Sequence, residues 1–239
     1  MSAACVFPTK VLPVIIEALP LWHFQTNCYI VGDRPGGKAI VIDIPGEPDV
    51  VAERLDEHDL TPIAILHTHG HIDHLGGSGQ FSRNYGGLPA YIHPLDRDRL
   101  VDPRSQLGGL AAMLGDLEID PPDEIIAIDE GDKLDLAGFP LKAIHTPGHT
   151  PGHLCYLLSD VETDDGSADI LFSGDHLFAG SVGRTDLPGG DWEVLMNSMR
   201  EKILPLPDET LVAPGHGPIT TIGQERKTNP FLVEAAGSL

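Results

Sequence analysis

The sequence predicts an α/β protein in which two β-sheets stack face to face and helices cover their outer sides. Two observations carry this prediction. Short segments rich in Val and Ile, bounded by Pro, Gly and Asp, recur in both halves of the 239-residue chain, with segments of helical spacing between them. No stretch of low-complexity composition separates the halves. We therefore expect residues 1–239 to form a single domain.

The first half of the chain predicts four strands and one helix. Residues 48–58 carry apolar side chains at helical spacing among charged ones, which indicates a surface helix. The continuous apolar run 63–66 is typical of a strand that is buried on both faces. The other three expected strands span residues 11–16, 27–31 and 39–43.

Beyond the fourth strand the pattern is less regular before strands resume. We expect a helix that ends at residues 81–85, a strand over 89–93 and two short helices within 96–116. The acidic segment 160–169 is expected to be an exposed hairpin loop. The later strands are expected at residues 125–128, 133–136, 141–145, 154–158, 170–172 and 210–213, with a helix at 191–203.

The chain is strongly acidic, with 15 basic against 36 acidic residues and a net charge of −21. This charge argues against nucleic acid or an anionic membrane surface as a partner, because phosphate binding needs a basic face. No apolar run approaches the roughly 20 residues that span a bilayer. The three cysteines are widely spaced and form no CxxC pair, which favours a reducing compartment. We expect a cytoplasmic protein; its oligomeric state is not indicated.

Residues 67–77 read HTHGHIDHLGG and concentrate possible metal ligands directly after the buried strand. On an extended or turning backbone His69 and His71 project to one side, so both can bind one ion. Asp73 and His74 then point toward a neighbouring position. Imidazole and carboxylate ligands suit zinc, iron or manganese, and the absence of thiolates argues against a structural zinc cluster.

Three later segments place similar side chains beside turn residues. His149 lies in TPGHTPGH, Asp175 in FSGDH and His216 in APGHGP, each on a loop that follows an expected strand. Rigid scaffolds commonly present functional groups on such loops. A glycine beside each of these residues lets the backbone approach the site closely.

Together these residues resemble the HxHxDH signature of the metallo-β-lactamase superfamily and its three later ligands, in order, over roughly residues 27–217. The resemblance implies the metallo-β-lactamase fold, a four-layer αββα sandwich of two mixed sheets with outer helices. It also implies two divalent metal ions. By that resemblance the first ion is bound by His69, His71 and His149, the second by Asp73, His74 and His216, and Asp175 bridges both.

The resemblance further implies hydrolysis by a metal-bound hydroxide. Two ions that share a water lower its pKa from about 15.7 toward about 7, and an ion polarises the carbonyl under attack. Asp73 is expected to orient the hydroxide as well as to bind metal, which makes it the candidate catalytic residue. Zinc is the expected metal, with iron and manganese as alternatives.

The segments TPGHTPGHLCY (146–156) and SGDHLFAGSVGR (173–184) resemble the glyoxalase II family, the hydroxyacylglutathione hydrolases. The ending ERKTNPFL (225–232) resembles the short glyoxalase II-like hydrolases. The resemblance implies a small-molecule thioester substrate such as S-lactoylglutathione. Those enzymes carry a basic residue at the position of Arg184 that contacts the glutathione moiety, so Arg184 is a candidate substrate-binding residue. The alternative is that it only pairs with Asp186.

Two departures leave the substrate open. Full-length glyoxalase II has a helical C-terminal domain that supplies much of its glutathione site, whereas 23 residues follow His216 here, so another thiol carrier or another ester is an alternative. The segment GRTD (183–186) also resembles the persulfide dioxygenases, which use a single iron in the same fold. We favour the hydrolase, because the ending and the complete second metal site both point to it.

Four further histidines need an interpretation. His153 and His176 lie next to expected ligands and are candidates for supporting or substrate contacts. His67 and His145 are expected to be strand-end residues, with His67 structural or supporting a ligand.

Overall fold

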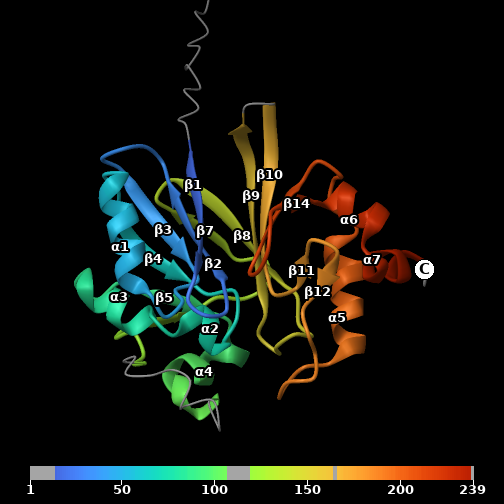
Figure 1. Cartoon of the computed structure of the whole chain (residues 1–239), viewed down its shortest axis with the longest axis horizontal. Helices are drawn as coiled ribbons and strands as arrows, with labels where there is room; N and C mark the ends of the chain where they lie inside the picture. The colour runs from blue at the N-terminus through green and yellow to red at the C-terminus, as the bar shows by residue number, and fades with distance from the viewer. Residues whose placement is uncertain (1–13, 107–118, 164–165, 238–239) are drawn as a thin grey trace, which may run out of the picture.

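The computed structural model describes residues 14–106, 119–163 and 166–237, which form two six-stranded sheets stacked face to face (Figure 1). In the first sheet the strand order is β1-β2-β3-β4-β5-β6. β1 to β3 pair antiparallel, whereas β3 to β6 pair parallel. These strands are β1 (Ile15–Leu21), β2 (Thr26–Gly32), β3 (Lys38–Ile42), β4 (Thr61–Leu66), β5 (Ala90–Ile92) and β6 (Ile125–Ala127).

The second sheet has the order β14-β13-β10-β9-β8-β7, and only β10 and β13 pair parallel. A separate two-stranded sheet joins β11 and β12. The strands are β7 (Lys133–Leu136), β8 (Phe139–His145), β9 (Leu154–Thr163), β10 (Gly166–Gly174), β11 (Leu177–Phe178), β12 (Ser181–Val182), β13 (Leu211–Pro214) and β14 (Thr220–Thr221).

Helices cover the outer face of each sheet, which confirms the four-layer αββα sandwich (Figure 1). α1 and α3 lie on the first sheet, and α5, α6 and α7 lie on the second. The helices are α1 (Pro48–Glu57), α2 (Ile72–Leu75), α3 (Ser78–Asn84), η1 (Pro94–Asp96), α4 (Arg97–Val101), η2 (Pro103–Gln106), α5 (Trp192–Ser198), the π-helix η4 (Met199–Ile203), α6 (Ile222–Thr228) and α7 (Pro230–Gly237).

Side-chain alternation along the strands explains the layers. In β2, Cys28 and Ile30 face the core beneath α1 and α3, whereas Tyr29 and Val31 face the core between the sheets. In β10, Leu171 faces α5 while its neighbours face inward. Since successive side chains of a strand point to opposite faces, a strand between two cores is apolar on both.

The parallel pairings bring the functional loops to one edge of the sandwich. β3 and β4 are parallel, so the residues that follow each of them lie at the same end of the first sheet. β8 and β10 both run antiparallel to β9, and β13 runs parallel to β10, so their carboxyl ends also share one end of the second sheet. The segments that follow these strands hold all the expected metal ligands.

Most expected elements are confirmed, and the differences have physical reasons. β9 and β10 continue into the acidic segment 160–169 that was expected to be a loop. In the described part of this segment β9 and β10 pair only with each other and extend past the other strands of the sheet. Few of their side chains are buried there, so the sequence lacks the apolar residues that would indicate a strand. The first strand extends to Leu21, and the start expected at residues 11–13 lies outside the described residues. Residues 107–116 of the helical stretch also lie outside them. The helices α6 and α7 and the short strands β11, β12 and β14 were not expected.

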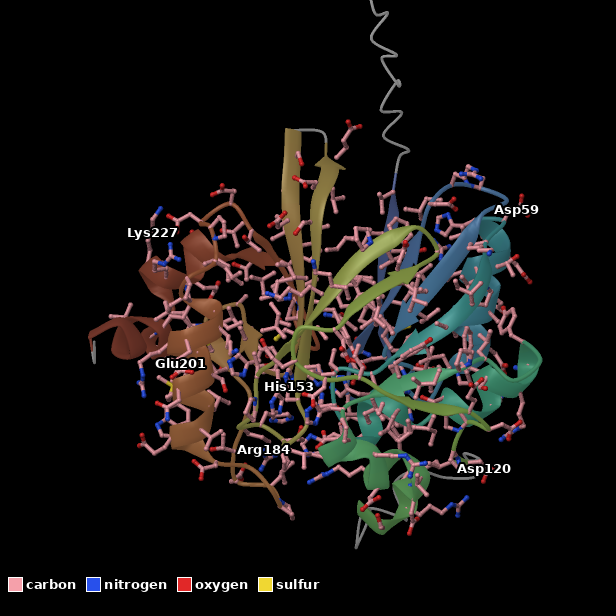
Figure 2. The ribbon with its side chains drawn as sticks, turned by 180° about the vertical axis from the view of Figure 1, so that it is seen from behind. Asp59, Asp120, His153, Arg184, Glu201 and Lys227 are labelled. Carbon is pink, nitrogen blue, oxygen red and sulfur yellow. The ribbon has the colours of Figure 1, made fainter. Side chains whose placement is uncertain are left out.

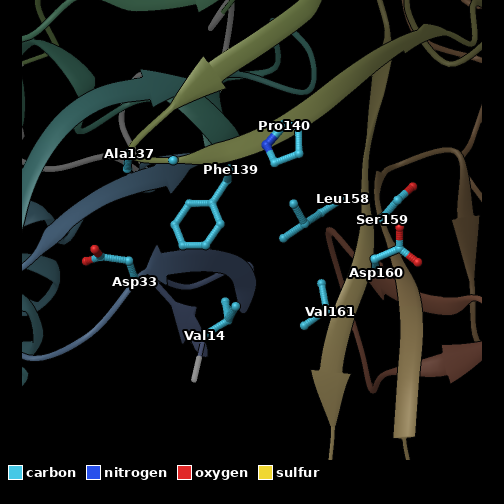
Figure 3. A pocket seen from close by; sticks show the side chains of 10 residues that line it. Val14, Asp33, Ala137, Phe139, Pro140, Leu158, Ser159, Asp160 and Val161 are labelled. Carbon is cyan, nitrogen blue, oxygen red and sulfur yellow. The ribbon is translucent and has the colours of Figure 1, made fainter. Parts of the chain in front are cut away.

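A pocket of about 370 Å³ lies where the two sheets separate at the other end of the sandwich (Figure 3). Val14, Asp33, Phe139 and Leu158 are among the side chains that line it. Phe139 begins β8, whereas the histidine loop follows the end of that strand, so this pocket is separate from the expected metal site. Within the described residues, none of the helices has the length and apolar character that crossing a bilayer requires.

The stacking of the two sheets can be tested at Phe172, which is fully buried between them and packs edge-on against Tyr29 at 5.2 Å. We expect Phe172→Ala to lower the free energy of unfolding by about 3–5 kcal/mol, because it leaves a cavity in a packed core. Urea denaturation measures the change. Val233→Ala, at a side chain that is 51% exposed, is the control and should change stability by less than about 0.5 kcal/mol. Similar losses in both variants would contradict the assigned core.

Candidate metal centre

Three buried histidine nitrogens face one another at the seam between the sheets. His69 Nε2 lies 3.1 Å from His71 Nδ1, and His71 Nδ1 lies 2.8 Å from His149 Nε2. His69 Nε2 and His149 Nε2 are 3.2 Å apart. His69 and His71 follow β4 in the first sheet, whereas His149 lies on the loop from β8 to β9 in the second. The fold thus brings together the three residues expected at the first metal.

Hydrogen bonds behind the rings determine where the protons are. His149 Nδ1–H donates to the carbonyl oxygen of Arg184 at 2.6 Å. Thr68 donates its hydroxyl proton to Asp43 at 2.7 Å and therefore accepts from His69 Nδ1–H at 3.1 Å. The Nε2 atoms of both neutral rings then carry free lone pairs. His71 can carry its proton on Nε2, a buried atom for which the described residues offer no hydrogen-bond partner.

This triangle fits a metal ion. Nitrogen ligands at 2.0–2.1 Å from a tetrahedral zinc lie about 3.3 Å apart, close to the separations of the three nitrogens. Lone pairs that face one another without enough protons to share repel, and a cation between them would remove that repulsion. The residues at this position therefore fit a divalent ion bound by three imidazoles.

A second group of possible ligands lies beside the first. Asp73 Oδ2 is 3.3 Å from His216 Nε2 and 3.7 Å from His74 Nε2. The Nδ1 atoms of both histidines form hydrogen bonds away from Asp73. His74 Nδ1 donates to Asp43 at 2.8 Å, and His216 Nδ1 donates to the carbonyl of Phe24 at 3.2 Å. Both Nε2 atoms are thereby directed at Asp73 and could hold an ion with it.

Asp175 lies between the two groups. Its Oδ1 is 3.3 Å from His74 Nε2, and its Oδ2 is 3.5 Å from both His149 Nε2 and His216 Nε2. Oδ1 is buried and has no hydrogen-bond partner among the described residues. One carboxylate thus reaches histidines of both groups, which is the position expected for a ligand that bridges two ions.

The two groups differ in their electrostatics. Burial lowers the pKa of His69 and of His149, and burial together with His149 lowers the pKa of His71 to about 3. These rings are therefore neutral at neutral pH. At His74 burial also lowers the pKa, but the carboxylates of Asp175, Asp73 and Asp43 outweigh it and raise the pKa well above its usual value. A proton and a cation would therefore compete for the same nitrogen in the second group.

Close backbone approaches shape the centre, as the neighbouring glycines suggested. A Cβ added at Gly215 would lie 2.3 Å from Asp175 Oδ1 and 2.7 Å from His74 Cε1. At Gly148, φ is +134° and an added Cβ would lie 2.3 Å from the Cα atom of Leu195 in α5. Neither position has room for a side chain.

Sequence reasoning missed Asp43, which supports both groups. It is 2% exposed, accepts from the backbone N–H and the hydroxyl of Thr68, and accepts from His74. The sequence signal was an acidic residue at the end of an apolar strand. In the structure Asp43 has a positive φ of +59°. Asn27 and Tyr29 were also missed; their side chains donate to the carbonyl of Pro214 and so fix the His216 loop against β2.

The structure also locates the other residues singled out from the sequence. His153 accepts from the backbone N–H of Asp175 at 3.0 Å, as expected of a supporting residue. Both ring nitrogens of His176 are buried, and neither has a hydrogen-bond partner within the part of the chain that the structure describes. Figure 2 shows His153 near the centre of the molecule and Arg184 on the loop below it. The Arg184 guanidinium is exposed and forms a two-point ion pair with Asp186, while its carbonyl holds His149.

The family model described as the metallo-β-lactamase superfamily matches residues 21–216. An uncharacterized protein of Mycobacterium tuberculosis, Rv2581c, is 42% identical over 92% of this chain and 98% of its own length. The hydroxyacylglutathione hydrolase GloC of Haemophilus influenzae is 38% identical over 91% of this chain and 97% of its own. The chain therefore belongs to the metallo-β-lactamase superfamily of metal-dependent hydrolases.

Solved structures support the same assignment. BLEG-1, a B3 metallo-β-lactamase, aligns with a TM-score of 0.78 and 38% identity over 91% of this chain and 99% of that one. TTHA1623 in a di-iron-bound form aligns with a TM-score of 0.73 and 39% identity over 92% of this chain and 100% of that one. ETHE1 of Myxococcus xanthus aligns with a TM-score of 0.70 and 26% identity over 90% of this chain and 83% of that one. The superfamily binds divalent metals, and the His and Asp groups described above could hold them.

The close packing of the His149 loop against α5 gives a test. We expect Gly148→Ala to lower the free energy of unfolding by about 2–5 kcal/mol, since it combines backbone strain with a clash. Gly86→Ala is the control: Gly86 also has a positive φ, +79°, but an added Cβ meets no atom of the described residues within 4 Å. It should lose only about 1–2 kcal/mol. Equal losses by urea denaturation would show that the contact with α5 does not constrain the loop.

Proposed function

We propose that the chain is a dinuclear metal-dependent thioester hydrolase that resembles hydroxyacylglutathione hydrolases. The observation that carries the proposal is the pair of ligand groups with Asp175 between them. In this proposal His69, His71 and His149 bind one ion, Asp73, His74 and His216 bind the other, and Asp175 bridges both.

The bound ions would supply Lewis acidity and a water molecule that is acidic enough to ionise near neutral pH. The chain's own residues orient these ligands. Thr68 and the Arg184 carbonyl hold two imidazoles by their Nδ1 atoms, which fixes the tautomer that presents Nε2. Asp73 is 18% exposed in its side chain, and beyond its ligand role it is the carboxylate that we assign to orienting the nucleophilic water.

The thioester class is supported by the 38% identity to GloC over nearly the whole of both chains. It is also supported by the segments 146–156 and 173–184, which resemble glyoxalase II. Zinc is the proposed metal. The di-iron form of TTHA1623, at 39% identity, keeps iron as an alternative.

One substrate panel tests the proposal. Purified protein is assayed with S-lactoylglutathione for thiol release, with glutathione persulfide for oxygen uptake and with a β-lactam for ring opening. We expect thioester cleavage alone. Oxygen uptake would favour the persulfide dioxygenase that the GRTD segment also resembles. Ring opening as the main activity would favour the function named for BLEG-1, which is 38% identical. Either result would overturn the thioesterase proposal.

Asp73 tests the proposed chemistry. We expect Asp73→Ala to lower kcat at least about 100-fold, because it removes a ligand and the group that orients water. Asp56→Ala, at an exposed carboxylate of α1, is the control and should keep wild-type kcat. Full activity of the Asp73 variant would rule out the proposed mechanism.

Arg184 and Asp186 separate substrate binding from loop ordering. If Arg184 contacts the substrate, Arg184→Ala should raise KM about tenfold or more with less effect on kcat, since a hydrogen bond to a charged group contributes about 1.5–3 kcal/mol. Asp186→Ala removes the ion-pair partner but leaves the guanidinium. It should leave KM unchanged or lower it. If KM rose equally in both variants, the Arg184–Asp186 ion pair would act by ordering the loop, and Arg184 would not be a substrate-binding residue.

A further inference from the structure

Asp96 is a buried carboxylate that is not one of the proposed ligands. It contacts both loops that carry the histidines of the first metal group. It is 0% exposed and ends η1, which follows β5 in the first sheet. Its Oδ2 accepts from the backbone N–H of Gly70 at 2.9 Å and from the hydroxyl of Thr150 at 2.6 Å. Its Oδ1 accepts from the backbone N–H of Gly152 at 2.9 Å.

These three donors flank the first-group histidines. Gly70 separates His69 from His71, so its backbone position governs the spacing of both rings. Thr150 and Gly152 follow His149 on the loop between β8 and β9. One side chain therefore connects the loop of the first sheet that carries two ligands with the loop of the second sheet that carries the third.

The packing around Asp96 leaves little freedom. A Cβ added at Gly152 would lie 2.7 Å from the backbone nitrogen of Asp96 and 2.8 Å from its Cβ and Cγ atoms. A Cβ added at Gly70 would lie 2.7 Å from the Cδ atom of Arg99 in α4, the helix that follows Asp96. The η1–α4 segment thus lies against both ligand loops.

We propose that Asp96 is a positioning residue of the first metal group: it holds the His69–His71 loop and the His149 loop at the separation that lets one ion reach all three nitrogens. This role rests on the proposed metal centre and deepens it. The two carboxylate oxygens accept three hydrogen bonds from donors that lie 26 to 56 residues away in the chain. An amide of the same shape has one oxygen and one NH₂ group, so in Asp96→Asn at least one N–H or O–H donor faces another donor.

The effect on metal binding should be confined to one group. Asp96 contacts neither the second-group ligands nor Asp175 by any hydrogen bond that we observe among the described residues. Loss of an outer contact of this kind typically weakens metal affinity about 10- to 100-fold. A residue that merely stabilised the fold would not weaken one group selectively.

The test isolates each group with a ligand variant. His216→Ala leaves the first group intact, and His149→Ala leaves the second. Metal-free protein of each type, with and without Asp96→Asn, is titrated with Zn²⁺ in competition with a chromophoric chelator. We expect Asp96→Asn to weaken Zn²⁺ binding about 10- to 100-fold in the His216→Ala protein and less than about threefold in the His149→Ala protein.

Glu225 offers a matched control, because none of the hydrogen bonds that its carboxylate forms among the described residues involves a proposed ligand. It is 2% exposed and accepts three hydrogen bonds through its carboxylate, from Gly180, Thr220 and Asn229. Glu225→Gln makes the same chemical change and should leave Zn²⁺ affinity unchanged at both groups. Equal weakening by the two amide variants, equal weakening at both groups, or unchanged affinity in Asp96→Asn would overturn the proposal.

A milder variant covers the case in which Asp96→Asn does not fold. Thr150→Val removes one of the three donors and keeps the side-chain shape. It should weaken Zn²⁺ binding at the first group in the same direction but by less, and no change would overturn the proposal. The readout is metal binding without substrate, so it is independent of whether the holoenzyme cleaves thioesters. A failed thioester assay leaves this result intact, and the converse also holds.

Discussion

The centre depends on one constraint: three imidazole nitrogens, two of them with inward lone pairs, are held against one another inside the protein. His69, His71 and His149 bring their nitrogens within 2.8–3.2 Å, although the hydrogen bonds behind two of the rings direct lone pairs inward. Such an arrangement is unfavourable without a cation, so the surrounding fold has to maintain it. A bound ion would reverse this cost and stabilise the folded state by an amount that grows with its free concentration. Metal affinity and folding stability are coupled for that reason.

The proposed ligands come from both sheets, which makes the seam between the sheets the critical interface. Four of the proposed ligands follow β4 in the first sheet, and His149, Asp175 and His216 follow strands of the second. Hydrogen bonds cross the seam around them: Asn27 and Tyr29 reach Pro214, Tyr156 reaches the carbonyl of His67, and Asp96 reaches the His149 loop. Ions bound at the seam would act as further cross-links. The apolar core between the sheets and the polar contacts at its edge therefore both hold the two sets of proposed ligands at a fixed separation.

The sequence was sufficient to single out the expected ligands, which the fold brings together, but not the residues that hold them. His69, His71, Asp73 and His74 are adjacent in one motif, and the later ligands follow recognisable strands, so chain order alone indicates that they meet. Asn27 and Asp96 act on partners 26 to 190 residues away, and no local pattern reveals such contacts. The acidic segment 160–169 was misassigned as a loop because strands that pair only with each other bury few side chains. The fold class followed from short Val- and Ile-rich segments that recur with helical segments between them, and from the resemblance to the metallo-β-lactamase superfamily.

The most direct test of this account is the metal content per chain of protein purified without added metal and without chelators, measured by elemental mass spectrometry. The account predicts about two divalent ions per chain, because two ligand groups share Asp175. A single ion per chain, unchanged after dialysis against excess Zn²⁺ and removal of free metal, would contradict the dinuclear centre. It would show that the second group does not hold an ion of its own.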